Sequence, residues 1–218
     1  MTIKENEIQI IRPFGPILAK VKIPKKIVDE LNDYVDKTIK DEKKVSDLDH
    51  GKFLAGNVKQ EFKLELDFMK KIGWDQFLGK GAANWIKLAI GKRITSVDII
   101  ESWIVRQFEN EYNPTHWHGG HVSGVGYLKV PENLGPTAQK AKENINYNGH
   151  LQLIHGSRMF LSSSTITIKP EVGDFYFFPN YLMHVVYPFT NSNDERRSIS
   201  FNANIDPKVY NVYQTYFE

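Results

Sequence analysis

The chain is predicted to be mainly β with supporting N-terminal helices, an α+β protein built as a jelly roll or barrel-like sandwich. From Ser96 onward, at least seven short β-branched or aromatic runs are separated by Gly, Pro, Asn and Asp. Before Ser96, apolar residues recur mostly at helical spacing. A length of 218 residues suits one domain. We expect helical support over about 1–95 and the jelly-roll core over about 96–218.

The N-terminal part is expected to contain two short strands and three helices. Residues 7–24 alternate well enough for two strands, divided by Pro13, Gly15 and Pro16. Apolar residues at three- and four-residue steps predict helices over 24–42, 58–72 and 81–91. None of these helices gathers titratable groups on its apolar face, so packing is their expected role.

Composition limits the possible chemistry. With 28 basic and 26 acidic side chains the formal charge is only +2, which is weak evidence for a nucleic-acid partner. The chain has no cysteine, so any metal must be held by His and carboxylate. The polar start lacks an apolar signal region, and no run approaches the ~18 apolar residues of a membrane helix. We therefore expect a cytoplasmic protein without a membrane partner.

The stretch "NPTHWHGGH", residues 113–121, holds three of the seven histidines. On a strand His116 and His118 project to the same side and can bind one metal ion, whereas His121 lies beyond that pair. A lone H-x-H is equally compatible with ordinary surface or core histidines. His184, which follows "GDFYFFP" at the start of another strand, favours the metal because it supplies a third ligand.

A second candidate feature is "DERRSISFNANI", in which an arginine pair leads into an alternating strand. An arginine that points inward from a strand is costly unless it meets an anion, and its planar guanidinium suits a carboxylate. A surface arginine pair is the alternative.

Together these motifs resemble a known family. The chain contains H-x-H, then "SGVGYLKVP", then P-x-x-G-D-x-Y-x-F-P-x-Y-x-x-H-x-V-x-P and finally "RRSISFN". Over about residues 97–206 this order resembles the 2-oxoglutarate/Fe(II)-dependent oxygenases of marine phages and bacteria. The resemblance implies a double-stranded β-helix, a jelly-roll variant that agrees with the strand count.

The resemblance also implies a set of iron ligands. His116 and His184 look like the two histidines of the facial triad, and His118 stands where most 2-oxoglutarate oxygenases have Asp or Glu. We favour His118 as the third ligand. In the other assignment, His118 is the first ligand and Gly120 occupies the third position, which leaves a vacancy like that of the related halogenases.

For the co-substrate, the resemblance assigns Arg196 to the C5 carboxylate of 2-oxoglutarate. Ser198 is placed to donate a second hydrogen bond, and Tyr127 resembles the tyrosine that commonly completes the carboxylate site, with an ordinary core aromatic as the alternative. Arg197 should point the other way. Three residues of the preceding strand are further candidates for the cavity wall: Trp103, Arg106 and Gln107.

The implied activity is that of a dioxygenase using Fe(II), 2-oxoglutarate and dioxygen, with release of succinate and carbon dioxide. Hydroxylation is the expected outcome, and halogenation or another oxidation are alternatives. Three other classes stay open: a three-histidine cupin-like metalloenzyme that does not use 2-oxoglutarate, a zinc hydrase or hydrolase, and a non-enzymatic jelly-roll binding module. A protein side chain, a small molecule and a modified base all remain candidate substrates, and the sequence leaves the oligomeric state open.

Overall fold

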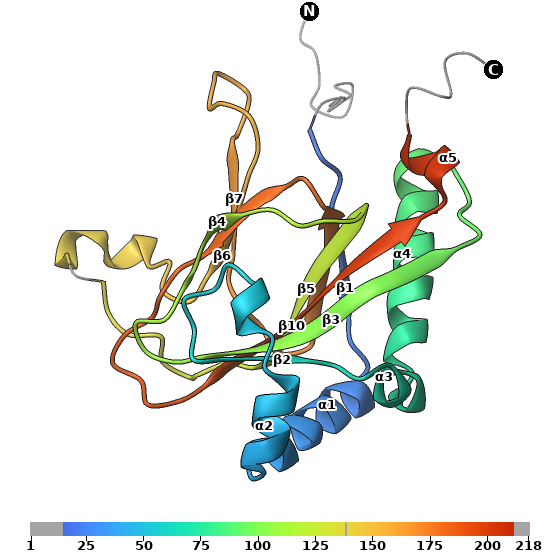
Figure 1. Cartoon of the computed structure of the whole chain (residues 1–218). Coiled ribbons are helices and arrows are strands. Elements are labelled where there is room, and N and C mark those ends of the chain that lie inside the picture. The colour runs from blue at the N-terminus through green and yellow to red at the C-terminus, as the bar shows by residue number, and fades with distance from the viewer. Residues whose placement is uncertain (1–14, 138, 212–218) are drawn as a thin grey trace, which may run out of the picture.

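Two antiparallel sheets lie face to face in the computed structural model, which describes residues 15–137 and 139–211 (Figure 1). The larger sheet has the order β1 (Ala19–Lys22), β8 (Asp174–Pro179), β5 (Val122–Lys129), β10 (Arg196–Ile205), β3 (Val97–Gln107) and β2 (Gln60–Lys63). The smaller sheet has the order β4 (Asn113–His116), β9 (Met183–Val186), β6 (Leu151–Ile154) and β7 (Thr165–Ile168). The predicted jelly roll with N-terminal helices is confirmed.

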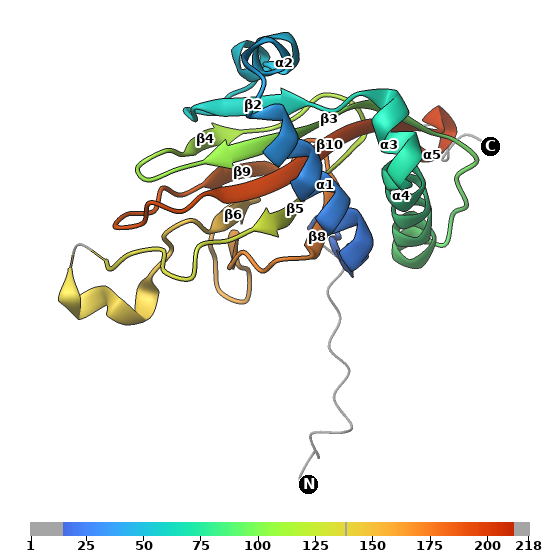
Figure 2. The same ribbon diagram turned by 90° about the horizontal axis from the view of Figure 1, so that it is seen from below.

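Helices cover the outer face of the larger sheet. Three of them, α1 (Lys25–Thr38), α3 (Leu66–Ile72) and α4 (Trp74–Ile90), add buried residues to the core there. The other described helical segments are α2 (Glu42–Leu48), the short α5 (Pro207–Tyr210) and the 3₁₀ turns η2 (Gly51–Phe53) and η3 (Lys140–Ile145). Figure 2 shows α1 lying across the sheet and α4 at one end of it. Leu31, Trp74 and Leu78 from the helices join Phe177 and Phe201 from the sheet in one buried cluster. The helices therefore provide the main core behind the sheet.

Strand alternation decides which residues of the larger sheet face the smaller one. On β10, Ser198 lies opposite Val105 of β3 and Tyr127 of β5, and the three share the inner face. Their neighbours Ile199 and Ile104 point into the helix-covered core. The inner face carries the polar residues, so a polar site can form between the sheets without interrupting the main core.

Two details of the N-terminal part differ from the prediction. Residues 60–63, placed in a helix over 58–72, form β2 because Phe62 pairs with Ile104 of β3 and is 1% exposed. Sheet pairing outweighs a helical period that is only two turns long. The first of the two strands predicted in 7–24 falls largely in residues 7–14, which lie outside the described residues, and the second is β1.

The first and last residues of the helices also differ from the prediction. The predicted helix over 24–42 ends at Thr38, and a separate α2 follows, with the Asp41 side chain accepting a hydrogen bond from the Lys44 N–H. Helix α4 begins at Trp74 rather than at residue 81. Among the described helices, none is both long enough and apolar enough to span a bilayer.

Candidate functional site

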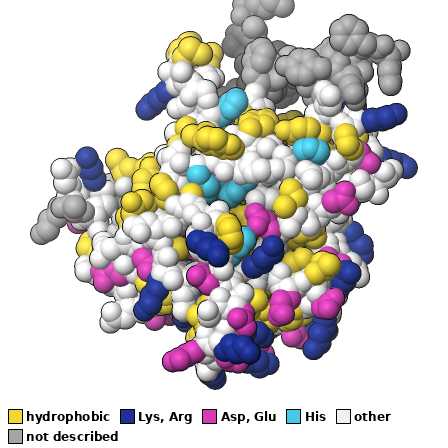
Figure 3. Space-filling model, viewed as in Figure 1, with side chains coloured by type: hydrophobic (Ala, Val, Ile, Leu, Met, Phe, Trp, Pro, Cys, Tyr) yellow, Lys and Arg dark blue, Asp and Glu magenta, His cyan; other side chains and the backbone are white. Residues whose placement is uncertain are grey.

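Three histidines meet between the two sheets. His116 ends β4 and lies directly opposite His184 of β9, and His118 follows two residues after β4. One ligand nitrogen from each of the three lies within 4.8 Å of the others. Histidine side chains gather near the middle of the face shown in Figure 3. The structure thus brings together the three residues that the sequence suggested as metal ligands.

Backbone carbonyls fix the tautomers of two of these imidazoles. Nδ1 of His116 lies 2.6 Å from the carbonyl oxygen of Pro114, and Nδ1 of His184 lies 2.8 Å from that of Leu182. A carbonyl oxygen can only accept, so each Nδ1 must donate its proton. Each Nε2 then keeps a lone pair, and orientation of this kind is typical of metal-ligating histidines.

Burial keeps the three imidazoles neutral. It lowers the pKa of His116, and it lowers the pKa of His184 to about 4, with nearby His116 as a lesser cause. Burial and the two neighbouring histidines lower the pKa of His118 to about 3. Neutral imidazole is the form that binds a metal, so at neutral pH no protons need to be displaced.

The spacing of two lone pairs fits a metal ion. Nε2 of His118 lies 3.0 Å from Nε2 of His184, and ligand nitrogens held at right angles about 2.1 Å from a metal would be about 3.0 Å apart. The single N–H proton of neutral His184 is on Nδ1, so its Nε2 has no proton to donate to His118. Three neutral nitrogen donors with converging lone pairs suit Fe(II) as well as other divalent ions.

Arg196 supplies positive charge in the same pocket. The side chain is 1% exposed, and Nη1 donates to the Gln107 side-chain oxygen at 3.0 Å. Nε and Nη2 are buried and have no hydrogen-bond partner among the described residues. A buried guanidinium with two unused donors is costly unless an anion completes it. Because Arg196 and the three histidines line one pocket, that anion would lie beside the metal position.

The other predicted co-substrate residues surround this guanidinium. The Arg196 guanidinium lies 5.1 Å from the centre of the Tyr127 ring, and Nη1 is 3.4 Å from Oγ of Ser198. The Tyr127 hydroxyl is buried with no hydrogen-bond partner in the described part of the chain, and burial raises the pKa of Tyr127 to about 12. It therefore stays protonated and can donate a hydrogen bond to an anion held by Arg196.

Of the three further candidates for the cavity wall, two lie at the pocket and one does not. Trp103 lines the pocket, with its ring 5.5 Å from that of His118, and Gln107 contacts Arg196. The expectation that Arg106 lines the cavity is wrong, because strand alternation turns it to the opposite face. There Arg106 forms an ion pair with Glu195 at 2.8 Å.

His121 also lies apart from the histidine cluster. Its ring stacks on Tyr210 at 3.9 Å, and its Nδ1 accepts a hydrogen bond from the Ile205 N–H at 3.1 Å. His150 and His155 line two other hollows rather than the histidine pocket. Arg197 does point away from the pocket, toward Glu195 and Asp36.

Sequence reasoning missed two residues near the site. Asn113 lines the histidine pocket three residues before His116, and only its place in the "NPTHWHGGH" stretch hinted at this. His50, which belongs to none of the sequence motifs, is 9% exposed and pairs with Glu101 at 2.9 Å. No local pattern links residues 50 and 101.

Comparisons with known proteins point to the 2-oxoglutarate- and Fe(II)-dependent oxygenases. Residues 101–202, just under half of the chain, match the family model described as "Putative 2OG-Fe(II) oxygenase". A search of curated proteins found no match.

Solved structures share the fold at low identity. The viral collagen prolyl hydroxylase of Paramecium bursaria Chlorella virus-1, solved with 2-oxoglutarate, is 16% identical with a TM-score of 0.52, covering 85% of this chain and 94% of its own. A Pseudomonas putida prolyl-4-hydroxylase is 13% identical with a TM-score of 0.53, covering 85% and 91%. HygX from Streptomyces hygroscopicus, with nickel and 2-oxoglutarate bound, is 10% identical with a TM-score of 0.53, covering 86% and 82%. The matched stretch contains all three clustered histidines, Arg196 and Tyr127.

Proposed function

We propose that this chain, a 2-oxoglutarate- and Fe(II)-dependent oxygenase, holds iron through His116, His118 and His184 and hydroxylates its substrate. The observation that carries the residue assignment is the convergence of three neutral imidazoles beside a buried, half-satisfied guanidinium. When bound, Fe(II) and 2-oxoglutarate supply an oxidative decarboxylation that yields succinate and carbon dioxide and transfers one oxygen atom of dioxygen to a C–H bond of the substrate.

His118 is the proposed third ligand. Its Nε2 lies 3.0 Å from Nε2 of His184, and one ligand nitrogen of His116 lies within 4.8 Å of both rings' ligand nitrogens, whereas Gly120 has no side chain to offer and a φ of 81°. This arrangement supports hydroxylation, because a protein nitrogen stands where the halogenase-like alternative requires a vacancy. Three protein ligands leave three positions of an octahedral ion open. These suffice for a bidentate 2-oxoglutarate and for dioxygen.

Arg196 is the proposed anchor for the C5 carboxylate of 2-oxoglutarate. Its unpaired Nε and Nη2 offer two parallel donors of the kind that bind a carboxylate in bidentate fashion. Gln107 orients the guanidinium from one side, and the Tyr127 hydroxyl and Ser198 are placed to add hydrogen bonds. The chain would thus fix one end of the co-substrate so that the other end meets the histidines.

The rest of the pocket wall limits the access of water. Val105, Val125 and Phe178 from the larger sheet face Leu151 and Val186 from the smaller one. Apolar walls strengthen the interactions of Arg196 with an anion and protect reactive species from water.

The substrate is a separate part of this proposal. Two of the similar structures are prolyl hydroxylases, one of them for collagen, which supports a residue within a polypeptide as the substrate.

The resemblance of the motifs to oxygenases of marine phages and bacteria supports a phage or bacterial origin, and with it action in the cytoplasm of the producing or host cell.

An anaerobic titration tests the proposed function. Fe(II) and 2-oxoglutarate are added to the purified protein while the weak visible charge-transfer band of the iron chelate is followed, with His184→Ala and Arg196→Ala alongside. We expect the band in the wild-type protein, no band in His184→Ala, and a band requiring far more 2-oxoglutarate in Arg196→Ala. Iron binding without any band would instead favour the cupin-like alternative that does not use 2-oxoglutarate, and would make the assignment of Arg196 wrong.

A further inference from the structure

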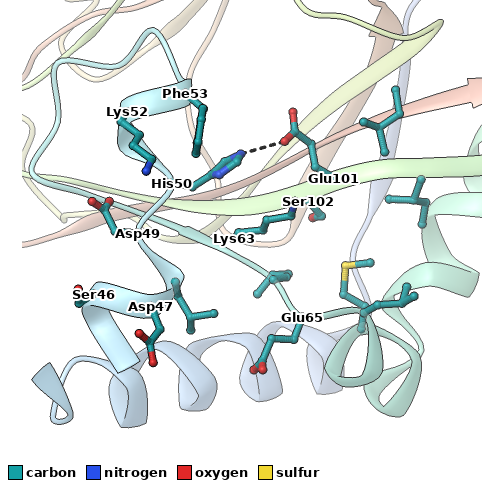
Figure 4. A pocket seen from close by; sticks show the side chains of 16 residues that line it. Ser46, Asp47, Asp49, His50, Lys52, Phe53, Lys63, Glu65, Glu101 and Ser102 are labelled. Carbon is teal, nitrogen blue, oxygen red and sulfur yellow. Dashed lines mark hydrogen bonds and ion pairs between the residues drawn. The ribbon is translucent and has the colours of Figure 1, made fainter. Parts of the chain in front are cut away.

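A groove of about 650 Å³ lies between η2, the end of β2, α3 and the first half of β3 (Figure 4). Its floor is apolar, with Leu64, Met69 and Ile99. Figure 4 shows His50 and Glu101 pointing toward each other across it, with Glu65 on the opposite side. None of the residues proposed to hold iron or 2-oxoglutarate lines this groove.

One side of the groove is an open strand edge. Strand β2 pairs with β3 only as far as Lys63 opposite Trp103, and the Leu64 N–H then donates to the Ser102 carbonyl. Strand β10 continues along the other side of β3 as far as Val97. In the described part of the chain, no strand pairs with the β2 side of residues 97–101. Such an edge offers N–H and C=O groups to an extended peptide.

The charge of the groove selects the kind of peptide. Two lysines, Lys52 and Lys63, line it together with His50, against four carboxylates: Asp47, Asp49, Glu65 and Glu101. Glu101 accepts hydrogen bonds from His50 at 2.9 Å and from the Asn202 side chain at 3.2 Å, which hold its carboxylate in place. An acidic rim around an apolar floor complements a peptide that carries both basic and apolar side chains.

The groove leads toward the proposed iron site. Glu101 and Trp103 are two residues apart on one strand and pair with Asn202 and Ser200, so they lie on the same face of the sheet. Two residues of a strand span about 7 Å. The Trp103 ring lies 5.5 Å from that of His118. Since β2 occupies the edge of β3 from Ser102 onward, a peptide must leave the edge there and cross the inner face past Glu101 to bring a following residue toward the histidines.

We infer that this groove binds an extended, basic polypeptide segment, which adds as a strand to the open edge of β3 and places a positively charged side chain against Glu101. The role of this segment as the substrate rests on the proposed function, whereas its binding does not.

Binding to metal-free protein tests the inference, because it does not depend on iron or 2-oxoglutarate. The probe is a fluorescent nine-residue peptide of alternating Thr and Val with Lys at its centre, and fluorescence anisotropy is measured in EDTA. Matched probes carry norleucine or Glu at the centre. We expect the Lys probe to bind about tenfold more tightly than the norleucine probe, and the Glu probe to bind least.

Backbone methylation tests strand addition separately. Two further Lys probes carry N-methyl groups on the odd or on the even residues. A strand uses only one edge for pairing with β3, so one methylated probe should lose at least tenfold in affinity and the other should keep it. Equal behaviour of the two probes would show that the peptide does not add to the strand edge.

Protein variants locate the bound peptide. Glu101→Gln should weaken binding of the Lys probe about three- to tenfold and leave the norleucine probe unchanged, and Asp47→Asn on exposed α2 should act in the same direction without disturbing the interior. The matched control is Asp33→Asn on α1, an equal change of charge outside the groove. The inference is wrong if no Lys probe binds the wild-type protein, or if Glu101→Gln and Asp47→Asn both bind it like the control. Peptide binding without the iron chelate band would instead leave the groove intact and reject the oxygenase.

Discussion

The Nε2 atoms of His118 and His184 lie 3.0 Å apart, although 66 positions separate the two residues in the chain. His184 is held by β9 and by the bond from its Nδ1 to the Leu182 carbonyl. His118 is held by its backbone N–H, which donates to the Asn180 carbonyl at 3.1 Å. Backbone contacts on both sides therefore preorganise two nitrogen ligands before any metal arrives.

His118→Ala is expected to abolish stoichiometric iron binding, because two remaining histidines give too few ligands. His118→Asp should retain iron, since a carboxylate restores the usual facial triad. Metal content after anaerobic loading and desalting measures both. His121→Ala, a change in the same loop outside the cluster, is the control and should bind iron normally. If His118→Ala keeps its iron, His118 is not a required ligand and the assignment of the triad must change.

Arg196→Lys is expected to raise the 2-oxoglutarate concentration for half-saturation by at least 100-fold, because a lysine cannot provide two parallel donors from the same position. Tyr127→Phe removes a single hydrogen bond and should cost about tenfold. Both values come from the anaerobic chelate band. An unchanged half-saturation in Arg196→Lys would exclude Arg196 as the carboxylate anchor.

Glu195 is expected to stabilise the protein in a pH-dependent way. Burial alone would raise the pKa of Glu195, but hydrogen bonds from Arg197 and Arg106 outweigh it and hold the pKa at about 2. A depressed carboxyl pKa contributes stability above the unfolded value of 4.5 that is lost as pH falls toward 2. Glu195→Gln should cost about 3 kcal/mol at pH 7, because it removes the buried carboxylate charge that Arg106 and Arg197 share, and clearly less at pH 3. Urea unfolding at both pH values measures this, and an equal loss at both would contradict it.

Glu61 should lower the stability of the protein as pH rises, in contrast to Glu195. The side chain is 1% exposed, and neither carboxyl oxygen has a hydrogen-bond partner within residues 15–137 and 139–211. Burial together with nearby Asp49 raises the pKa of Glu61 to about 7. A raised carboxyl pKa gives stability that is complete below the unfolded value of 4.5 and lost as pH rises through 7. Glu61→Gln should therefore stabilise the protein at pH 8 by about 2 kcal/mol and change little at pH 4. Thermal unfolding across this range checks the sign, and a loss of stability at pH 8 would refute it.

Two glycines of α4 form a matched pair. A Cβ on Gly81 would lie 2.5 Å from the Phe177 ring, whereas a Cβ on Gly79 would meet nothing within 4 Å. Gly81→Ala should cost about 1–3 kcal/mol, because the helix must move off the sheet. Gly79→Ala should stabilise by up to about 1 kcal/mol through helix propensity. The free energy of unfolding of both variants is measured by denaturant titration. Similar effects at the two positions would show that α4 does not pack tightly on β8.

Much of the jelly roll could be predicted because strand patterning is local. The runs around β5, β8 and β10 carry their own alternation and turn residues, so each could be recognised without its partners. The N-terminal part was harder to predict. Residues 60–63 have a weak helical period, and only their pairing with β3 makes them a strand.

The sequence by itself determined the histidines, the arginine pair and the class of fold, since these depend on residue types and spacings within short segments. Only the tertiary structure decided that Arg196 faces the pocket while Arg106 faces away, that His50 meets Glu101, and that β2 ends early enough to leave an edge of β3 open. Each of these depends on which distant strands pair and in which register. Register is set by the packing of the whole core, and no short stretch of sequence contains that information.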